Sequence, residues 1–425
     1  MSAAPAHDRV AGSLRDGPDD GLDAAVLTLA VGAIAHGGHC LARAADGRVV
    51  FVRYALPGER VRAVVTEVHK GYLRADTVEV IEASPRRVAA PCVWFGRCGG
   101  CDLQHTDPEH QRELKAAVVR EQLLRLGGLS AAEVERLDVT VRALPAVPGE
   151  PPGQGWRTRV QYTVDSTGRA GLLAHRSHEV VPVDRCLIAH PRVRSAEVLT
   201  RSWEQAHGVE VVAGASGDPS VLEHRRGTAP ERVAGPPAVA EQAVGRRWTL
   251  APTAFWQVHP AAADTLAGAV TELLAPRRGD RIWDLYGGAG LFAAALAPHA
   301  DATGRITVVE ADPAAVAAAR ACLSDLTTVT VVHADVARAL ANPRWRSVDL
   351  VVLDPPRTGA GAAVVTAVAA RAPRAVAYVA CDPAAFARDV AAFREHGYRL
   401  AQLRGYDLFP HTHHVECVGL LVRHS

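Results

Sequence analysis

From about residue 265 onward, short apolar runs alternate with helical segments, and this alternation constrains the fold more than any other feature of the chain. Strands that alternate with helices form a parallel, doubly wound sheet. Strand-like runs are expected at residues 281–286, 306–310, 329–335, 348–354 and 375–380. Because such sheets bind ligands at the carboxyl ends of their strands, the residues that end these runs should surround one site.

A glycine-rich turn follows the first of these strands. Gly287-Gly-Ala-Gly290 lets the backbone approach a ligand at a helix N-terminus. Glu310 ends the second strand, about twenty residues later, where an acid can bind ribose hydroxyls. Asp335 ends the third strand and suits an adenine amino group. NAD, FAD and S-adenosylmethionine all fit this pattern. The missing G-x-G-x-x-G spacing and the preceding Asp284 favour the methyl donor.

The last run delivers Cys381 to a strand-to-helix turn. Asp382 suits the N-cap of the following helix and Pro383 its first position. Free N–H groups and the helix dipole would lower the thiol pKa below its usual value of roughly 8.5. A buried structural cysteine is the alternative for a single thiol. The convergence of the other strand ends on the same edge favours a nucleophile.

The N-terminal part has a different composition. Residues 25–82 contain short β-rich runs separated by Gly, Asp and Pro, which predicts a small barrel of the OB type. Such barrels often bind single-stranded RNA. Arg53, Lys70, Tyr72 and Arg74 can supply the RNA-binding face, and a solvated charged surface is an equal alternative. Residues 1–24, rich in Asp, Gly and Pro, are expected to be a disordered leader.

Three cysteines follow in a C-x5-C-x2-C pattern at Cys92, Cys98 and Cys101. Structural zinc usually takes two C-x2-C pairs or their histidine variants, and this segment has one such pair. An iron–sulfur cluster takes four thiolates, and Cys186 is available as the fourth. The spacing favours the cluster over zinc and over an unliganded trio.

The middle of the chain is less informative. A helix is expected at 110–126, a β-rich segment runs to Cys186, and residues 214–245 are expected to be irregular. We therefore divide the chain into a leader at 1–24, a barrel at 25–84, a cysteine-bearing β-rich domain at 85–250 and an α/β domain at 251–425.

Composition sets broad limits. Charged residues make up 22% and hydrophobic residues 48%, as in a globular protein with a large core. The chain has neither an apolar run of membrane-spanning length nor an apolar signal core, so a cytoplasmic protein is expected. The net charge of +1 neither requires nor excludes a nucleic-acid partner.

Together the motifs resemble one family, the RNA uracil-C5 methyltransferases with an N-terminal TRAM domain and a [4Fe-4S] cluster. The resemblance extends from about Val26 to Leu421. Its most specific motifs are Cys92-x5-Cys98-Gly-Gly-Cys101 with Gln104-His105, Phe255-Trp-Gln257-Val-His259, Asp284-Leu-Tyr-Gly-Gly288, Asp354-Pro-Pro-Arg357, Cys381-Asp-Pro383 and Phe409-Pro-His-Thr-His-His-Val-Glu416.

The resemblance implies roles for individual residues. It implies that the barrel grips RNA, more often ribosomal than transfer RNA, and that the protein is a monomer. The implied cluster ligands are Cys92, Cys98, Cys101 and Cys186. The implied S-adenosylmethionine contacts are Gln257, Tyr286, Glu310, Asp335 and Asp354. Cys381 matches the nucleophile, and Glu416 matches the base that removes a proton from C5 of the uracil.

The chain departs from the family pattern at five positions. Gly287 and Leu291 stand where many members have Cys and Asn, Ala380 and Asp382 stand where Ser and Asn are usual, and His259 stands where Asn is usual. Asp382 keeps the helix cap but adds a negative charge that opposes thiolate formation. Two alternatives follow: a cytosine-C5 methyltransferase, and an RNA-binding or chaperone protein whose methyltransferase fold is silent.

Overall fold

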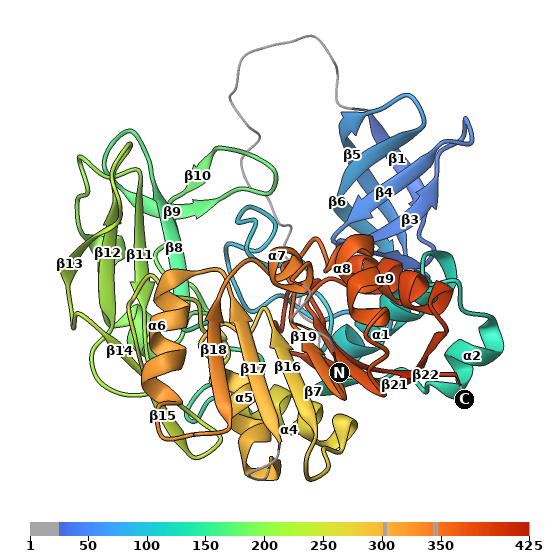
Figure 1. The fold of residues 1–425 in the computed structure, drawn as a ribbon. Helices are drawn as coiled ribbons and strands as arrows, with labels where there is room; N and C mark the ends of the chain where they lie inside the picture. The colour runs from blue at the N-terminus through green and yellow to red at the C-terminus, as the bar shows by residue number, and fades with distance from the viewer. Residues whose placement is uncertain (1–24, 301–303, 343–344, 346, 425) are drawn as a thin grey trace.

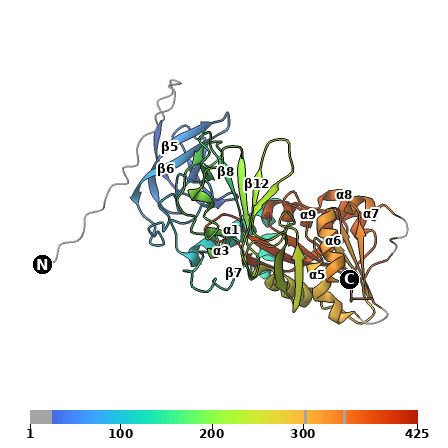
Figure 2. The same cartoon turned by 90° about the vertical axis from the view of Figure 1, so that its left-hand side faces the viewer.

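The computed structural model describes residues 25–300, 304–342, 345 and 347–424, so the predicted leader at 1–24 lies outside the described residues. Two views show a small β-barrel, an antiparallel sheet and a larger α/β sheet (Figures 1 and 2). In the second view the barrel and the α/β sheet occupy opposite ends of the molecule.

The barrel confirms the all-β module predicted near the N-terminus. Its side chains alternate between a buried and an exposed face, and the buried ones, such as Val50, Val52 and Leu73, form a separate core. Backbone bonds between Gly32 and Leu41 (2.7 Å) and between Leu41 and Ala33 (2.8 Å) join the segment after β1 to β3. The strands pair in the order β1-β5-β6-β4-β3-β2. They are β1 (Val26–Ala30), β2 (Ile34–Ala35), β3 (His39–Arg43), β4 (Val49–Arg53), β5 (Arg60–Val68) and β6 (Tyr72–Glu82).

An antiparallel sheet of order β10-β9-β8-β11-β12-β13 forms the middle of the chain, followed by the hairpin β14–β15. The expectation that residues 214–245 are irregular is wrong, because β12, β13 and β14 lie there. Polar residues and Gly-Pro turns obscure these short strands in the sequence. The bounds are β8 (Arg159–Val164), β9 (Ala170–Leu173), β10 (Val180–Val181), β11 (Gly208–Val212), β12 (Ser220–His224), β13 (Glu231–Ala234), β14 (Val239–Ala243) and β15 (Arg246–Leu250), with a short helix α3 (Pro191–Arg194) and a 3-10 turn at Val198–Thr200.

The α/β sheet has the order β18-β17-β16-β19-β20-β22-β21-β7. Its first five strands are parallel, as the alternating pattern predicts, while β22 runs antiparallel between β20 and β21. The strands are β7 (Val141–Ala143), β16 (Arg281–Leu285), β17 (Arg305–Glu310), β18 (Val329–His333), β19 (Leu350–Leu353), β20 (Ala375–Ala380), β21 (Tyr398–Asp407) and β22 (Glu416–Arg423).

Helices cover both faces of this sheet (Figure 1). The buried side chains of α4 and α5 pack on one face, and those of α1, α8 and α9 pack on the other. Successive strand residues such as Val351 and Val352 point into different cores, which is why the buried strands are apolar throughout. The helices are α1 (Pro108–Arg125), α2 (Ala131–Arg136), α4 (Ala262–Leu274), α5 (Leu291–Leu296) with a 3-10 turn at Ala297–His299, α6 (Pro313–Cys322), α7 (Val336–Leu340), α8 (Gly361–Ala369) and α9 (Pro383–Glu395).

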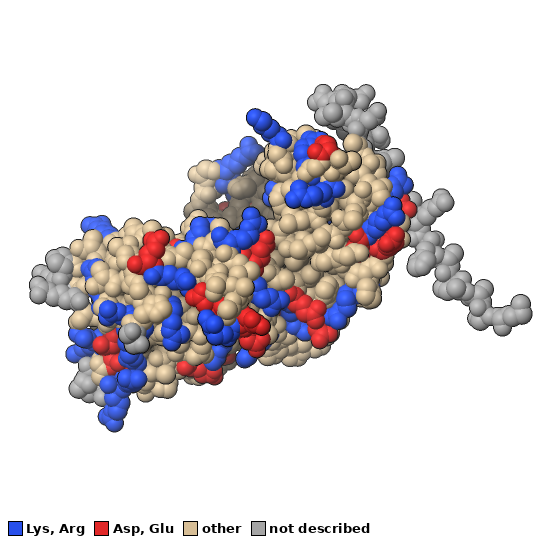
Figure 3. Space-filling model, turned by 90° about the vertical axis from the view of Figure 1, so that its right-hand side faces the viewer, with Lys and Arg blue, Asp and Glu red and all other residues tan. Residues whose placement is uncertain are grey.

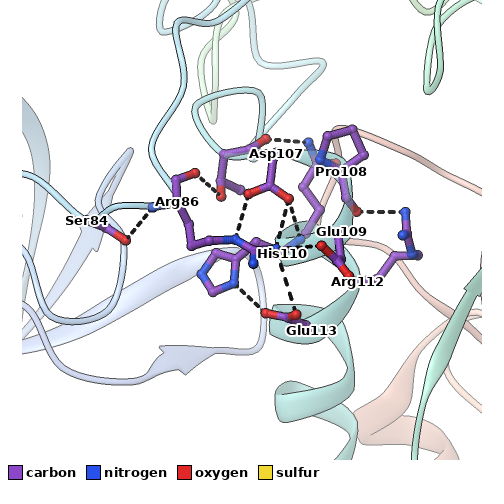
Figure 4. A network of polar contacts seen from close by, with 10 residues as sticks. Ser84, Arg86, Asp107, Pro108, Glu109, His110, Arg112 and Glu113 are labelled. Carbon is purple, nitrogen blue, oxygen red and sulfur yellow. Dashed lines mark hydrogen bonds and ion pairs between the residues drawn. The ribbon is translucent and has the colours of Figure 1, made fainter.

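Helix α1 ties the barrel to the α/β sheet. At its N-terminus, Asp107 caps the helix and accepts two hydrogen bonds (2.8 and 3.0 Å) from Arg86, which follows the barrel (Figure 4). Further along the helix, the buried Lys115 ammonium donates to Asp407 (2.6 Å), the last residue of β21. The segment 107–143 thus packs with the C-terminal sheet. The division at residues 84 and 250 stays a prediction.

Candidate active site

The glycine-rich turn after β16 is shaped by close packing. Tyr286 has a left-handed backbone (φ 60°), and Gly287 follows it. A Cβ atom on Gly287 would lie 2.5 Å from Cγ1 of Val308 and 3.1 Å from the carbonyl oxygen of Asp284. Glycine therefore fits at this departure from the family pattern because β17 approaches the turn closely.

Glu310 holds this turn in place. One carboxylate oxygen accepts from the N–H of Gly288 (2.9 Å), and the other accepts from the N–H groups of Ala311 and Asp312 (2.7 Å each). The same carboxylate thus links the glycine-rich turn to the end of β17. Its contact with ribose stays a prediction.

Carboxyl groups gather at this edge of the sheet. Their pKa values are shifted mainly by burial and by neighbouring carboxyl groups in the cluster, and not by a basic side chain. Burial, followed by the charge of Glu310, raises the pKa of Asp284 to about 7. Burial and the charges of Asp284 and Glu310 raise the pKa of Asp354 to about 7. Burial and Asp354 raise the pKa of Glu416 well above its usual range. Such a cluster favours a positively charged ligand.

Asp284 is also incompletely bonded. Its Oδ2 accepts from the N–H of Ala293 (3.0 Å), whereas its buried Oδ1 has no hydrogen-bond partner within the described residues. A buried acceptor left in this way is costly unless a ligand donates to it. The sulfonium and ammonium groups of S-adenosylmethionine fit these carboxylates, so the residues present suit that cofactor.

The nucleophile and base predictions fall on neighbouring strands. Cys381 follows β20, and Glu416 begins β22. Ala380 lies opposite Cys417 in the antiparallel register. Cys381 follows Ala380 and Glu416 precedes Cys417, so these two residues are also neighbours. Together with burial, the negative charge of Glu416 at this separation raises the pKa of the Cys381 thiol.

The predicted lowering of the Cys381 pKa is wrong for the protein alone. Burial and the charges of Glu416 and Asp354, partly opposed by Arg357, together raise the pKa of this thiol to about 11. The N-cap prediction is correct, since Asp382 Oδ1 accepts from the N–H of Ala385 (2.7 Å). The helix N-terminus is present, but desolvation and nearby carboxyl groups outweigh it.

The remaining predicted cofactor residues lie in three settings. Tyr286 is half-buried, and burial followed by the charge of Asp335 raises its pKa to about 12. Asp335 is exposed and caps α7 through the N–H of Arg338 (3.0 Å). Gln257 belongs to the loop between β15 and α4, away from the strand ends in sequence.

Two residues that the sequence did not indicate support the Gln257 loop. Trp248 donates to the carbonyl oxygen of Ala289 (2.8 Å) in the glycine-rich turn, and its ring lies 5.0 Å from that of Trp256. Thr158 donates to the carbonyl oxygen of Val258 through its backbone N–H (2.9 Å) and its hydroxyl (3.0 Å). The loop is therefore fixed between the central sheet and the glycine-rich turn. Both partners come from distant segments, so no local pattern could indicate them.

The four predicted cluster cysteines line one cavity, together with Gln104 and Arg157. Burial raises the pKa of Cys98 to about 11, and the charges of Cys186 and Cys92 add to the effect. The N–H of Gly100 lies 3.4 Å from the Cys98 sulfur. In the described part of the chain, no three His, Cys, Asp or Glu side chains converge on a point suited to a single metal ion. The cysteines surround a space, an arrangement that fits a multi-atom centre.

The loop of Cys101 is bonded to the segment that precedes Glu416. The N–H groups of Asp102 and Leu103 donate to the carbonyl oxygen of His411 (2.8 and 2.9 Å). The Asp102 carboxylate accepts from the backbone N–H (3.0 Å) and ring Nδ1 (2.7 Å) of His413. The pairing joins positions 311 residues apart, so no local sequence pattern could predict it.

The predicted RNA face of the barrel is assembled but partly neutralised. Arg74 lies over the ring of Tyr72 (5.6 Å), and its guanidinium is 3.2 Å from the Glu67 carboxylate. Arg53 lies over Tyr54 (4.4 Å), and Lys70 is exposed. One face of the molecule shows basic and acidic side chains intermingled, with a hollow beside the barrel (Figure 3). RNA binding by these residues stays a prediction.

No helix among the described residues is long and apolar enough to span a membrane.

The raised pKa of Asp284 predicts a pH-dependent stability penalty. In the unfolded chain this carboxyl ionises near pH 4, whereas in the folded protein it holds its proton up to about pH 7. Stability should therefore fall as pH rises through this window. Asp284→Asn keeps an acceptor for Ala293 and removes the penalty, so its melting temperature should exceed that of the parent protein by several degrees at pH 8, with the difference shrinking toward pH 5.

Asp218→Asn is the matched control, because Asp218 is exposed and its substitution should give no pH-dependent difference. Differential scanning calorimetry measures both series. A lower melting temperature of Asp284→Asn at pH 8 would contradict the predicted charge penalty.

Comparisons with known proteins identify the families and relatives that this chain resembles. Residues 24–78 match the TRAM domain family, and residues 239–424 match the tRNA (Uracil-5-)-methyltransferase family. An uncharacterized RNA methyltransferase of Streptomyces avermitilis is 46% identical, covering 92% of this chain and 96% of the relative. The 23S rRNA (uracil(1939)-C(5))-methyltransferase RlmD of Chromohalobacter salexigens is 33% identical, covering 94% of this chain and 90% of the relative.

A solved structure shares the fold. The Pyrococcus abyssi tRNA (uracil-54, C5)-methyltransferase, in complex with S-adenosyl-L-homocysteine, superposes with a TM-score of 0.65 at 22% identity and covers 92% of this chain and 99% of its own. Together with the near full-length relatives, these matches confirm the resemblance to TRAM-containing RNA uracil-C5 methyltransferases, while the [4Fe-4S] cluster stays a prediction. The chain belongs to the tRNA (uracil-5-)-methyltransferase family of RNA-modifying enzymes and carries an N-terminal TRAM domain.

Proposed function

We propose that this protein transfers a methyl group from S-adenosylmethionine to C5 of a uridine in RNA through a covalent bond between Cys381 and C6 of the base. The observation that carries the proposal is the pairing of β20 with β22. It sets a thiol beside a carboxyl group at the ligand-binding edge of the sheet.

The chemistry requires both groups. Uracil C5 is weakly nucleophilic, so the Cys381 sulfur first bonds to C6, and the electron pair of the C5–C6 double bond moves toward the C4 carbonyl oxygen as an enolate. S-adenosylmethionine supplies the electrophilic methyl group that C5 then attacks. The Glu416 carboxylate removes the C5 proton, the double bond re-forms, and the C6–sulfur bond breaks.

In this mechanism the ionisation of Cys381 and the ionisation of Glu416 are linked. Ionised Cys381 and ionised Glu416 repel each other, and burial disfavours both charges, so the pair tends to hold a proton in the protein alone. A positive charge bound near Asp284 and Asp354 lowers the pKa of both groups. Thiolate formation and base activation are thus linked to occupation of the same edge.

The cofactor contacts are proposed from the family motifs and their placement. Glu310 and Tyr286 lie at the glycine-rich turn, and Gln257 lies on the loop packed against that turn. Asp335 follows β18 and Asp354 follows β19, two parallel strands of the same sheet. The free Oδ1 of Asp284 adds an acceptor to this set. These groups can together bind an amine, ribose hydroxyls and a sulfonium.

A [4Fe-4S] cluster is proposed for the cavity lined by Cys92, Cys98, Cys101 and Cys186. Four thiols around a shared space support it, as does the Gly100 N–H directed at a ligand sulfur. Close packing supports it further, because a Cβ atom on Gly99 would lie 2.8 Å from the backbone nitrogen of His175. The loop can follow this path only with glycine.

Ribosomal RNA is the proposed substrate. Support comes from the relatives named for 23S rRNA, which match this chain over nearly their whole length. We further propose that the protein acts in the cytoplasm as a monomer, with its barrel, cysteine-bearing and methyltransferase domains divided near residues 84 and 250.

Cells lacking the gene should lose one 5-methyluridine from ribosomal RNA. Loss from transfer RNA alone, measured by nucleoside mass spectrometry of the separated RNAs, would overturn the choice of substrate.

The covalent step predicts a trapped adduct. RNA with 5-fluorouridine at the target position should stay bound to the protein, because fluorine at C5 cannot leave as a proton. Cys381→Ala should abolish the adduct on denaturing gels. Cys417→Ala, which removes a buried thiol on the adjacent strand, should retain it. An adduct that survives Cys381→Ala would refute the nucleophile. Protein that binds RNA but forms no adduct and transfers no methyl group would favour a silent fold.

The cluster predicts a defined metal content. Protein purified without oxygen should be brown and carry iron and sulfide near four per chain, as a four-iron cluster requires. Cys186→Ser should lower both, whereas Cys322→Ser, a partly exposed cysteine away from the cavity, should not. Stoichiometric zinc in place of iron would exclude the cluster.

A further inference from the structure

The tip of the β2–β3 hairpin reaches from the TRAM barrel to the active-site edge. The tip consists of His36, Gly37 and Gly38, between Ile34–Ala35 and His39–Arg43. A Cβ atom on Gly38 would lie 2.8 Å from Cβ of His413 and 3.1 Å from Cβ of Asp102. The barrel therefore touches both the cysteine loop and the segment leading to Glu416.

From this tip, His36 contacts the residue that follows the nucleophile. Its Nε2 lies 3.1 Å from Oδ2 of Asp382, while Oδ1 of the same carboxylate caps α9 through Ala385 (2.7 Å). Although burial opposes ionisation, the hydrogen bonds from His36 and Ala385 hold the Asp382 pKa at about 2. The carboxylate is thus ionised and accepts only, so the His36 ring nitrogen is the donor.

This contact compensates the charge that distinguishes Asp382 from the asparagine usual in the family. Asp382 directly follows Cys381, whose ionisation is disfavoured by Glu416 and Asp354 and favoured by Arg357. On the neighbouring strand, burial and the charge of Glu416 raise the pKa of Cys417, and the charge of Asp382 adds to them. Without a donor at Oδ2, this charge would act more strongly against a Cys381 thiolate.

We propose that His36 is a positioning residue of the methyl-transfer reaction, which holds the Asp382 carboxylate in its helix-capping orientation and offsets its charge beside the nucleophile. The proposal rests on the proposed role of Cys381. It assigns to the barrel a contact beside the reaction centre in addition to its predicted contact with RNA.

Docking of the barrel does not depend on this contact alone. Arg86 bonds to Asp107 at the start of α1, and Gly38 packs against Asp102 and His413. The side chains of His36 and Asp382 are 38% and 27% exposed, so substituting them leaves the core intact. The effect of His36 on the nucleophile can therefore be measured separately from folding.

A double-mutant cycle tests the proposal with His36→Ala, Asp382→Asn and the two combined. One readout is the rate of Cys381 alkylation by iodoacetamide against pH, followed by mass spectrometry of the Cys381 peptide. The other is the rate of adduct formation with 5-fluorouridine RNA. Glu416, Asp354 and Arg357, which face the thiol, are unchanged in every variant.

His36→Ala should slow both reactions roughly threefold to tenfold near pH 8 and move the alkylation profile to higher pH, as loss of one hydrogen bond to a charged group implies. In the Asp382→Asn background, the same substitution should have almost no effect, because the charge is gone. His36→Gln retains an N–H donor and should recover most of the rate. His110→Ala removes a comparable histidine–carboxylate contact with Glu113 (2.8 Å) on α1 and should change neither readout.

Equal losses from His36→Ala in both backgrounds would overturn the proposal, because His36 would then act on the barrel or the RNA. An unchanged alkylation profile in His36→Ala would also overturn it. Failure of the proposed function appears differently: the unsubstituted protein forms no 5-fluorouridine adduct, while the alkylation profile still reports whether His36 acts through Asp382.

Discussion

The antiparallel pairing of β22 with β20 is the interaction on which the site depends. Both strands are buried on both faces, so the register between Ala380 and Cys417 is strongly specified. A slip of one residue would turn Glu416 toward the opposite face of the sheet and away from Cys381. The proposed base and the proposed nucleophile therefore lie close together because a hydrophobic sheet is packed in this register, and neither group has to be held by a flexible loop.

Three contacts fix the point at which β22 enters the sheet. Lys115, only 1% exposed, donates to the carboxylate of Asp407 (2.6 Å) and to the carbonyl oxygen of Phe409 (3.1 Å). Removing the lysine would leave a buried charge, which typically costs about 3–5 kcal/mol. Asp102 holds His413 from the cysteine loop, and Gly38 lets the barrel approach the same place. The segment before Glu416 is thus supported by helix α1, the cysteine loop and the barrel together.

Local sequence patterns predicted much of this structure. The parallel strands, the residues at their ends and the Asp382 cap follow from apolar runs and helix-start residues, and the structure has them as expected. The raised pKa of the Cys381 thiol could not be predicted from local patterns, because desolvation depends on which distant segments pack around this residue. The same holds for His36 and Asp382, which meet across 346 positions of sequence. The strands within 214–245 were not predicted, because their residues have a weak local preference for β-structure and tertiary packing stabilises them.

The carboxyl cluster has one further consequence for how the site works. The charges of Glu416 and Asp354 disfavour a thiolate at Cys381. The charge of Glu310 disfavours ionisation of both Asp284 and Asp354, and the charge of Asp284 disfavours ionisation of Asp354. A cation bound among them relieves both penalties, and by linkage a thiolate at Cys381 strengthens binding of that cation to the same degree. In the proposed mechanism, the carboxyl groups that would bind a positively charged methyl donor would therefore also keep the Cys381 thiol protonated before the donor binds. Such an arrangement would protect a partly exposed cysteine from reacting outside the catalytic cycle.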